Sequence, residues 1–219
     1  MTIRPDERPS EVASPTRRPM WPSMRTALVA FDINHFGDER RGNDIQLYLR
    51  QAMYELIGDA FFSVSPVWEN WYREDRGDGV FVIAPPCVPA EALMDPLAQH
   101  LLAGLRRRNQ MASTLTHLQL RMAVHTGQIH RDPHGIAGHA ALHLFRLLDA
   151  TTFKKAAVNS DADLALIVSD HLFADARHSG LIEAEAYQPL RVSIKETRAR
   201  AWLWLPPLPH RRSPFQPMN

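Results

Sequence analysis

The chain has 219 residues with 25 basic and 24 acidic side chains, so its net charge of +1 excludes the basic excess of a general nucleic-acid binder. Its hydrophobic fraction of 45% is normal for one globular domain. The single cysteine, Cys87, excludes an internal disulfide and favours a reducing compartment, and no apolar run is long enough to cross a membrane. We therefore expect a cytoplasmic protein whose partners include neither a membrane nor a nucleic acid.

The two ends of the chain differ in composition from the middle. Residues 1–22 hold five prolines, several charges and few large apolar side chains, which cannot bury a core. The last residues are again rich in proline and arginine. We expect a disordered leader at 1–22, a folded domain at 23–206 and a loose tail at 207–219.

The first half of the chain alternates short apolar runs with amphipathic stretches. Spacings of three and four residues indicate helices, and short apolar or alternating runs indicate strands. In chain order, the pattern predicts a strand at 26–33, a helix at 43–62, strands at 67–74 and 80–84 joined by a hairpin at 76–79, and a helix at 90–111.

The second half is organised around residues 120–149. The pattern predicts a strand at 118–124 that breaks at Thr126 and Gly127, then a hairpin rich in glycine, histidine and proline. It continues with a helix at 138–150, a strand at 164–169, a helix at 170–178 that ends before Gly180, and strands at 190–195 and 201–205. Hairpins dominate this order, so we expect an α+β domain in which helices pack on a mostly antiparallel sheet.

Two aspartates stand where strands end. Asp32 closes the apolar run at 26–33, and a carboxylate buried there needs a partner or a metal ion. Asp78 lies in the Arg-Gly-Asp-Gly turn of the predicted hairpin. Each residue also has an ordinary explanation, because aspartate commonly caps loops and fills hairpin turns. The residues alone leave both explanations open.

Histidines crowd the central stretch. Five of them lie within 19 residues: His125, His130, His134, His139 and His143. The last two have the i, i+4 spacing that can hold a transition metal on a helix. Because no cysteine or HExxH pattern accompanies them, we expect scattered hydrogen-bonding histidines rather than a zinc site.

Several short motifs occur together in one order: FDINHF at 31–36, GD at 77–78, LRMAVHTGQI at 120–129, an arginine at 146, LIVS at 166–169 and VSIKE at 192–196. In this order and spacing the chain resembles the class III nucleotide cyclase catalytic domain, the adenylate/guanylate cyclase homology domain, over roughly residues 25–206. The resemblance implies a ferredoxin-like α+β fold. It also implies a lyase that converts a nucleoside triphosphate into a 3′,5′-cyclic monophosphate and pyrophosphate.

The resemblance assigns roles to individual residues. The ligands of two divalent cations, Mg²⁺ or Mn²⁺, fall on Asp32, the carbonyl of Ile33 and Asp78. Two such cations suit a reaction that needs an activated attacking oxygen and a neutralised leaving group. Arg146 falls on the arginine that stabilises the transition state, and Lys195 on the lysine that binds the terminal phosphates. Taken alone, Arg146 is also a surface arginine with an acidic neighbour, and Lys195 a strand-edge lysine.

The resemblance further implies a homodimer. In the family, the metal ligands come from one subunit and the arginine and lysine from the other. We therefore expect a head-to-tail pair of identical chains with two composite sites and a nucleoside triphosphate as substrate.

The chain departs from the family at three positions. Leu142 stands where the family has a ribose-orienting asparagine, and His143, the next residue, is a candidate substitute. Glu74 occupies the first base-selecting position and is the guanylate-like choice, whereas Gly135, at the second position, has no side chain to select a base. The same fold includes bacterial pyrimidine cyclases of anti-phage signalling, so a cytidylate or uridylate cyclase is a further option.

Aromatic side chains precede the second aspartate. Trp68, Trp71 and Tyr72 could stack on a base, although we expect at least two of them to pack in the core. Two other functions stay open at this point. One is a degenerate cyclase domain that binds a nucleotide or a protein without turnover, and the other is a scaffold that binds no nucleotide.

Overall fold

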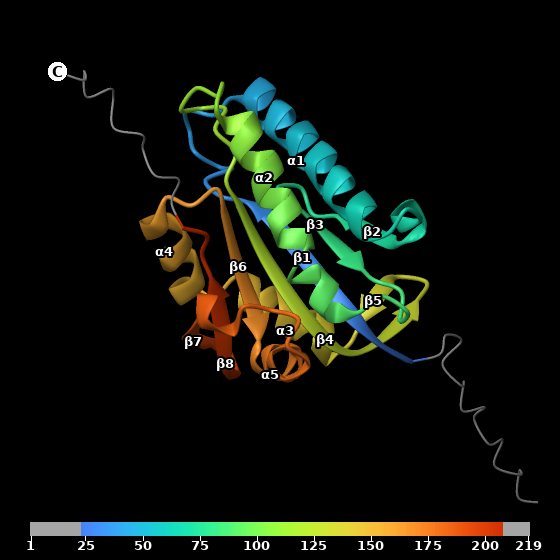
Figure 1. Cartoon of the computed structure of the whole chain (residues 1–219). Helices are drawn as coiled ribbons and strands as arrows, with labels where there is room; N and C mark the ends of the chain where they lie inside the picture. The colour runs from blue at the N-terminus through green and yellow to red at the C-terminus, as the bar shows by residue number, and fades with distance from the viewer. Residues whose placement is uncertain (1–22, 208–219) are drawn as a thin grey trace, which may run out of the picture.

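The computed structural model describes residues 23–207 and forms one eight-stranded sheet with helices on both faces (Figure 1). The strand order is β2-β3-β1-β4-β6-β8-β7, and β5 pairs with β4 alone. The predicted leader and all but the first residue of the predicted tail lie outside the described residues. The strands are β1 (Met24–Ile33), β2 (Tyr72–Asp75), β3 (Gly79–Ile83), β4 (Leu120–Asp132), β5 (Gly135–Ala137), β6 (Leu164–Ser169), β7 (Tyr187–Ile194) and β8 (Thr197–Trp204).

The sheet is mixed but mostly antiparallel. Only the pair of β4 and β6 is parallel, and every other recorded pair is antiparallel. A parallel pair needs a crossover connection, which here contains two helices between the strands. The predicted α+β class with a mostly antiparallel sheet is therefore confirmed.

The helices divide between the two faces of the sheet. Residues of α1, α2 and α5 join one buried cluster, and residues of α3 and α4 join the other. In Figure 1, α1 and α2 cross in front of the sheet and α3 lies behind it. The helices are α1 (Asn43–Val64), α2 (Leu97–Asn109), α3 (His139–Leu148), α4 (Thr151–Ser160) and α5 (Asp170–Ser179).

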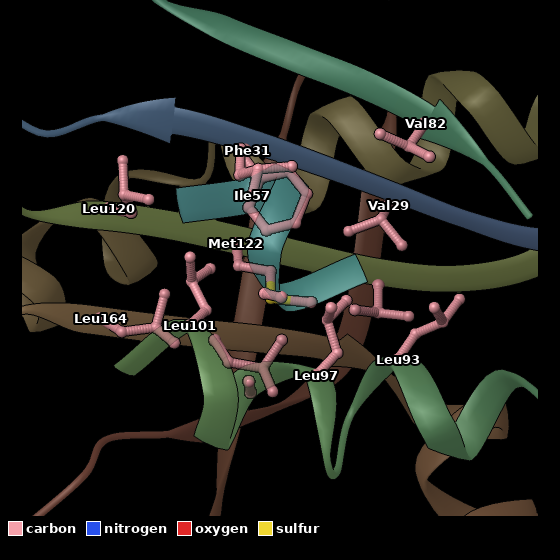
Figure 2. Packing of buried hydrophobic residues seen from close by; sticks show 14 of the residues in the cluster. Val29, Phe31, Ile57, Val82, Leu93, Leu97, Leu101, Leu120, Met122 and Leu164 are labelled. Carbon is pink, nitrogen blue, oxygen red and sulfur yellow. The ribbon is translucent and has the colours of Figure 1, made fainter. Parts of the chain in front are cut away.

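The larger core lies under α1 and α2. Alternate residues of the central strands point into it, among them Val29 and Phe31 of β1 and Met122 of β4, while Ile57 of α1 and Leu101 of α2 close it from the other side (Figure 2). Each of these side chains is at most 2% exposed. Because side chains alternate along a strand, the even-numbered residues of β1 face the other cluster, under α3 and α4.

Four details of the predicted elements are wrong. The predicted helix at 90–111 is a short 3₁₀ turn followed by α2, because Pro96 lacks the N–H that a continuous helix needs. The predicted strand at 67–74 begins as a 3₁₀ turn. Trp68 and Trp71 both pack against Phe61, and residues three apart lie on the same face in a helical turn but on opposite faces in a strand. Both tryptophans thus lie in the core, as expected for at least two of the three aromatic residues.

The other two errors lie beside the site. β4 does not break at Thr126 and Gly127, because both pair with residues of β1, and the strand continues to Asp132. The helix α4 was not predicted, although Phe153 and Ala157 have the i, i+4 spacing of its buried face. Within the part of the chain that the structure describes, no helix is long and apolar enough to span a membrane.

Candidate functional site

The predicted metal ligands come together at one end of β1. Asp32 pairs in register with Gly79, the residue after Asp78, and the backbone N–H of Ile33 donates to the carbonyl of Asp78 at 2.9 Å. Asp32 is 8% exposed, whereas Asp78 is exposed in the turn between β2 and β3. The backbone of two paired strands thus fixes the spacing of Asp32, Ile33 and Asp78.

A fourth residue at this place was missed by the sequence analysis. Arg121 lies opposite Asp32 in β4, where its Nε donates to Oδ1 at 2.7 Å and its Nη2 to Oδ2 at 2.9 Å. Both side chains are buried. We name Asp32, Ile33, Asp78 and Arg121 the metal corner. An arginine within an otherwise apolar strand was the available signal, because such a residue needs an acidic partner.

Burial and neighbouring charges shift the protonation of Asp32 in the metal corner. The pKa of Asp32 is raised from 3.8 to about 6, mainly by burial and to a smaller extent by the charge of Asp78, while Arg121 acts in the opposite direction. A buried carboxylate with this environment requires a positive charge beside it. In the described structure Arg121 supplies that charge.

The donor set of the metal corner fits Mg²⁺ or Mn²⁺. These hard cations bind oxygen, and Mg²⁺ is commonly held by one or two carboxylates together with substrate phosphates. The described residues contain no group of three or more histidine, cysteine or acidic side chains placed to hold a metal ion. Asp32, Asp78 and the Ile33 carbonyl would therefore hold a cation jointly with a phosphate-bearing ligand.

The two predicted base-selecting positions also meet. An ideal Cβ at Gly135 would lie 3.3 Å from Oε1 of Glu74 and 3.9 Å from the hydroxyl of Tyr72. Both oxygens of Glu74 already have partners, because the Tyr72 hydroxyl donates to Oε1 and Arg76 donates to Oε2 at 2.6 Å. Burial and this hydrogen bond raise the pKa of Tyr72 to about 12. Both oxygens of Glu74 are therefore engaged by neighbouring side chains.

Arg146 and Lys195 are brought near each other by the β7–β8 hairpin. Arg146 of α3 donates to Oγ1 of Thr197 and to Oε2 of Glu196, each at 2.6 Å. Lys195 is exposed in the turn of that hairpin, with a φ of 49°. The acidic neighbour of Arg146 is thus Glu196, whereas Asp149 pairs with Lys154.

Arg146 opens on a cleft that we name the histidine cleft. Its volume is about 680 Å³, and histidines form much of its wall. Neither metal-corner aspartate lines it. The lining residues are His125, Gly127, Gln128, His130, Gly138, His139, Ala140, Leu142, His143, Arg146, His171 and Thr197.

Three histidines of the cleft form a compact cluster. The ring of His125 lies 4.7 Å from that of His143 and 4.8 Å from that of His171, measured between centroids. His125 is 6% exposed, and its Nδ1 is buried with no hydrogen-bond partner. The pKa of His125 is lowered to about 3, mainly by burial and to a smaller extent by the neighbouring histidines. His171, from α5, lies outside the crowded stretch of sequence and was missed.

Gly127 lets the cleft form. A Cβ at this position would lie 2.6 Å from the Cβ of Ala140, so only glycine allows α3 to approach β4 here. This close approach brings His143 of α3 over His125 of β4. The glycine that the sequence analysis took for the end of a strand is therefore the point where helix and strand meet.

The arrangement of the whole chain is similar to that of nucleotide cyclase domains. An adenylate/guanylate cyclase/hydrolase from Silicibacter pomeroyi superposes with a TM-score of 0.61 at 19% identity, over 85% of this chain and 99% of the other. The guanylyl cyclase Cya2 has a TM-score of 0.54 at 14% identity, over 84% and 92% of the two chains. The guanylate cyclase domain of RhGC from Catenaria anguillulae, in complex with GTP, has a TM-score of 0.51 at 13% identity, over 82% and 94%.

No protein-family model and no curated protein matches the sequence. At these identities the structural likeness defines the fold. The chain has the fold of the adenylate and guanylate cyclase catalytic domains, and this confirms the fold that the short motifs predicted.

Proposed function

We propose that the chain is a nucleotide cyclase that converts a nucleoside triphosphate into a 3′,5′-cyclic monophosphate and pyrophosphate at the interface of a homodimer. The observation that carries the proposal is the meeting of Asp32, at the end of β1, and Asp78, in the turn that leads into the paired strand β3, within a cyclase fold. In the reaction, the ribose 3′-oxygen forms a bond to the α-phosphorus. The bond from that phosphorus to the bridging oxygen breaks, pyrophosphate leaves, and the 3′-hydroxyl proton passes to solvent.

The metal corner holds the charged part of the substrate. Asp32, Asp78 and the Ile33 carbonyl supply oxygen ligands for Mg²⁺ or Mn²⁺, two ions per site, which would lower the pKa of the attacking hydroxyl and neutralise the leaving group when bound. Arg121 is the counter-ion of Asp32 in the unliganded molecule, and a cation bound there takes over that role. The charge of the metal corner makes it a place where a buried cation is stabilised.

Arg146 and Lys195 act on the phosphates. The Arg146 guanidinium opens on the cleft and stabilises negative charge that grows on the transferred phosphate, as preorganised donors do. Lys195 lies exposed on the hairpin turn beside it and binds the terminal phosphates. Its compact charge suits a phosphate group.

A second copy of the chain completes the site. The cleft that contains Arg146 has no aspartate in its lining, so the metal corner of one chain and the Arg146 of another supply the two halves. A twofold pair of identical chains then forms two such sites.

The proposal includes a pyrimidine substrate and a role in anti-phage signalling. The pyrimidine substrate is supported by the two base-selecting positions. Glu74 is engaged by Tyr72 and Arg76, and Gly135 offers no side chain, so the pair matches neither the adenylate nor the guanylate pattern in full. The location we propose is cytoplasmic.

The test incubates the full chain with ATP, GTP, CTP or UTP and Mn²⁺, and detects cyclic monophosphates by mass spectrometry. We expect one cyclic product, and none from Asp78→Asn; the matched control is Asp59→Asn, an exposed aspartate on α1. Nucleotide binding without product would instead support a degenerate cyclase domain. Two observations favour that alternative: Asp32 is paired with Arg121, and Leu142 is apolar. Absence of binding would support a scaffold.

A further inference from the structure

One stripe of α3 faces the histidine cleft. His139, Leu142, His143 and Arg146 line the cleft, and their spacing of i, i+3, i+4 and i+7 places them on one side of the helix. Leu142 is 53% exposed and cannot hydrogen-bond. His143 and Arg146 are therefore the polar groups that this part of the helix offers to a ligand.

The ring of His143 has a fixed neighbourhood. It is half-buried against His125, which in turn contacts His171. The Nε2 of His171 lies 2.9 Å from the carbonyl oxygen of Thr126, and since a carbonyl only accepts, this nitrogen carries the proton and donates. The three rings thus form a row that is anchored on the backbone of β4.

Two members of the row, His125 and His143, favour the neutral form. Burial lowers the pKa of His143, and the charges of His171 and Arg146 lower it further. A neutral imidazole has one donor and one acceptor, which matches the hydrogen-bonding capacity of a hydroxyl group. No acidic side chain lines the cleft. The cleft therefore offers a cation for a phosphate and, beside it, a donor–acceptor pair for a hydroxyl.

We infer that His143 hydrogen-bonds the 2′-hydroxyl of the nucleotide ribose, and that His125 and His171 are the residues that position its ring. The inference rests on the proposed function, in which the 3′-oxygen is consumed as the nucleophile and the 2′-hydroxyl is the sugar hydroxyl that remains. His143 and Arg146 are three residues apart, which is about 4.5 Å along the helix axis. That separation suits a sugar hydroxyl and a phosphate of one nucleotide.

A metal ion does not explain the row. The described residues contain no group of three potential ligands arranged to hold one, and the row has no carboxylate member. Packing alone explains it poorly as well, because the Nδ1 of His125 is buried without a partner. An unpartnered buried polar group is costly unless a ligand or a rearranged neighbour satisfies it.

The test compares ribonucleotides with their 2′-deoxy counterparts. Binding of ATP, GTP, CTP and UTP and of the four deoxynucleotides is measured by calorimetry with Ca²⁺, which supports binding without turnover. We expect the wild-type chain to bind its preferred ribonucleotide about three- to tenfold more tightly than the deoxy form. His143→Leu should abolish this ratio, and His143→Gln should keep part of it.

Two further variants separate positioning from simple packing. His171→Gln retains a donor for the Thr126 carbonyl and should keep the ratio, whereas His171→Leu should reduce it. The matched control is His178→Leu, an exposed histidine of the same helix that does not line the cleft.

The outcomes distinguish this inference from the proposed function. A full ratio in His143→Leu overturns the assignment of His143 and leaves the cyclase proposal intact. Failure of all four ribonucleotides to bind overturns both.

Discussion

The metal corner and the histidine cleft lie on the same face of the sheet but are built differently. The metal corner is set by backbone pairing, because Asp32 pairs with Gly79 of β3 and the N–H of Ile33 donates to the carbonyl of Asp78 in the turn before β3. The histidine cleft is set by side chains from a strand and two helices, with His125, His143 and His171 in contact. Backbone pairing thus fixes the spacing of the carboxylates, whereas side-chain packing sets the spacing of the rings.

The two regions also differ in charge. The metal corner contains two carboxylates and one buried arginine, which pairs with Asp32. Removal of one partner from a buried ion pair typically lowers the free energy of unfolding by about 3–5 kcal/mol, and we expect a loss of that order here. The histidine cleft is lined by imidazole rings and one arginine, and its lining contains no carboxylate. Under the proposed function, a phosphate would need cations at the metal corner, whereas Arg146 would bind it directly in the cleft.

The largest expected effect tests whether the two regions work across subunits. Asp78→Asn and Arg146→Ala should each lower kcat by about a hundredfold or more, because one removes a metal ligand and the other a preorganised cation. If the protomers exchange and pair at random, a mixture of equal amounts should recover up to about a quarter of wild-type activity. Steady-state assays before and after mixing measure this recovery.

The control for mixing is the double variant Asp78→Asn/Arg146→Ala combined with Asp78→Asn. No intact site can form in that mixture, so its activity should stay at the level of the single variants. Co-purification of differently tagged chains shows whether protomers exchange. If they exchange and the mixture of Asp78→Asn with Arg146→Ala still has only the activity of the single variants, the two regions do not form a composite site.

The difference between the regions explains what the sequence could predict. Asp32, Asp78 and Arg146 were assigned from short motifs, and the strands β1 and β3 were visible as short apolar runs. The partner of Asp32 was not predicted. Arg121 is 89 residues away from it, and only the register of β1 with β4 aligns the two residues. The residue roles themselves stay predictions.

The cleft was harder to predict for the same reason. His143 was considered as a substitute for the missing asparagine, but its place beside Arg146 depends on the close approach of α3 to β4 at Gly127. His171 belongs to a helix that follows a later strand, and no local pattern links it to His125. Long-range packing, rather than local propensity, forms this part of the site.

The next effect concerns the stability of the cleft in acid. The pKa of His125 falls from 6.5 to about 3 on folding, so the unfolded chain binds a proton more tightly and the free energy of unfolding should decrease as the pH falls below 6.5. The groups that face His125 are His143, His171 and Arg25, all of which oppose its protonation. At roughly 1.4 kcal/mol per unit of pKa shift, the loss amounts to several kcal/mol.

His125→Phe should remove this loss, and urea unfolding at about pH 7 and about pH 4.5 measures it. Asp32 acts in the opposite direction, because its raised pKa favours the folded state as the pH falls, but it contributes equally to both proteins. His178→Leu should follow the wild-type curve. A parallel pH dependence in His125→Phe would show that folding does not disfavour the protonation of His125.

The smallest effect lies beside the metal corner, at the base-selecting positions. Gly135 has a φ of 127°, a conformation that other residues rarely adopt, and a Cβ there would press on Oε1 of Glu74 at 3.3 Å. Gly135→Ala should therefore lower the free energy of unfolding by about 1–2 kcal/mol, as measured by urea unfolding. Gly37→Ala, where a Cβ meets nothing within 4 Å, should change it little.

The same variant also tests how the base is selected. If Glu74 is held by Tyr72 and Arg76 for recognition, its displacement by the new methyl group should alter the ratio of activities with CTP, UTP, ATP and GTP. Gly37→Ala should leave that ratio unchanged. A destabilised Gly135→Ala protein with the wild-type ratio would mean that the glycine serves only the turn between β4 and β5, and that the base is selected elsewhere in the site.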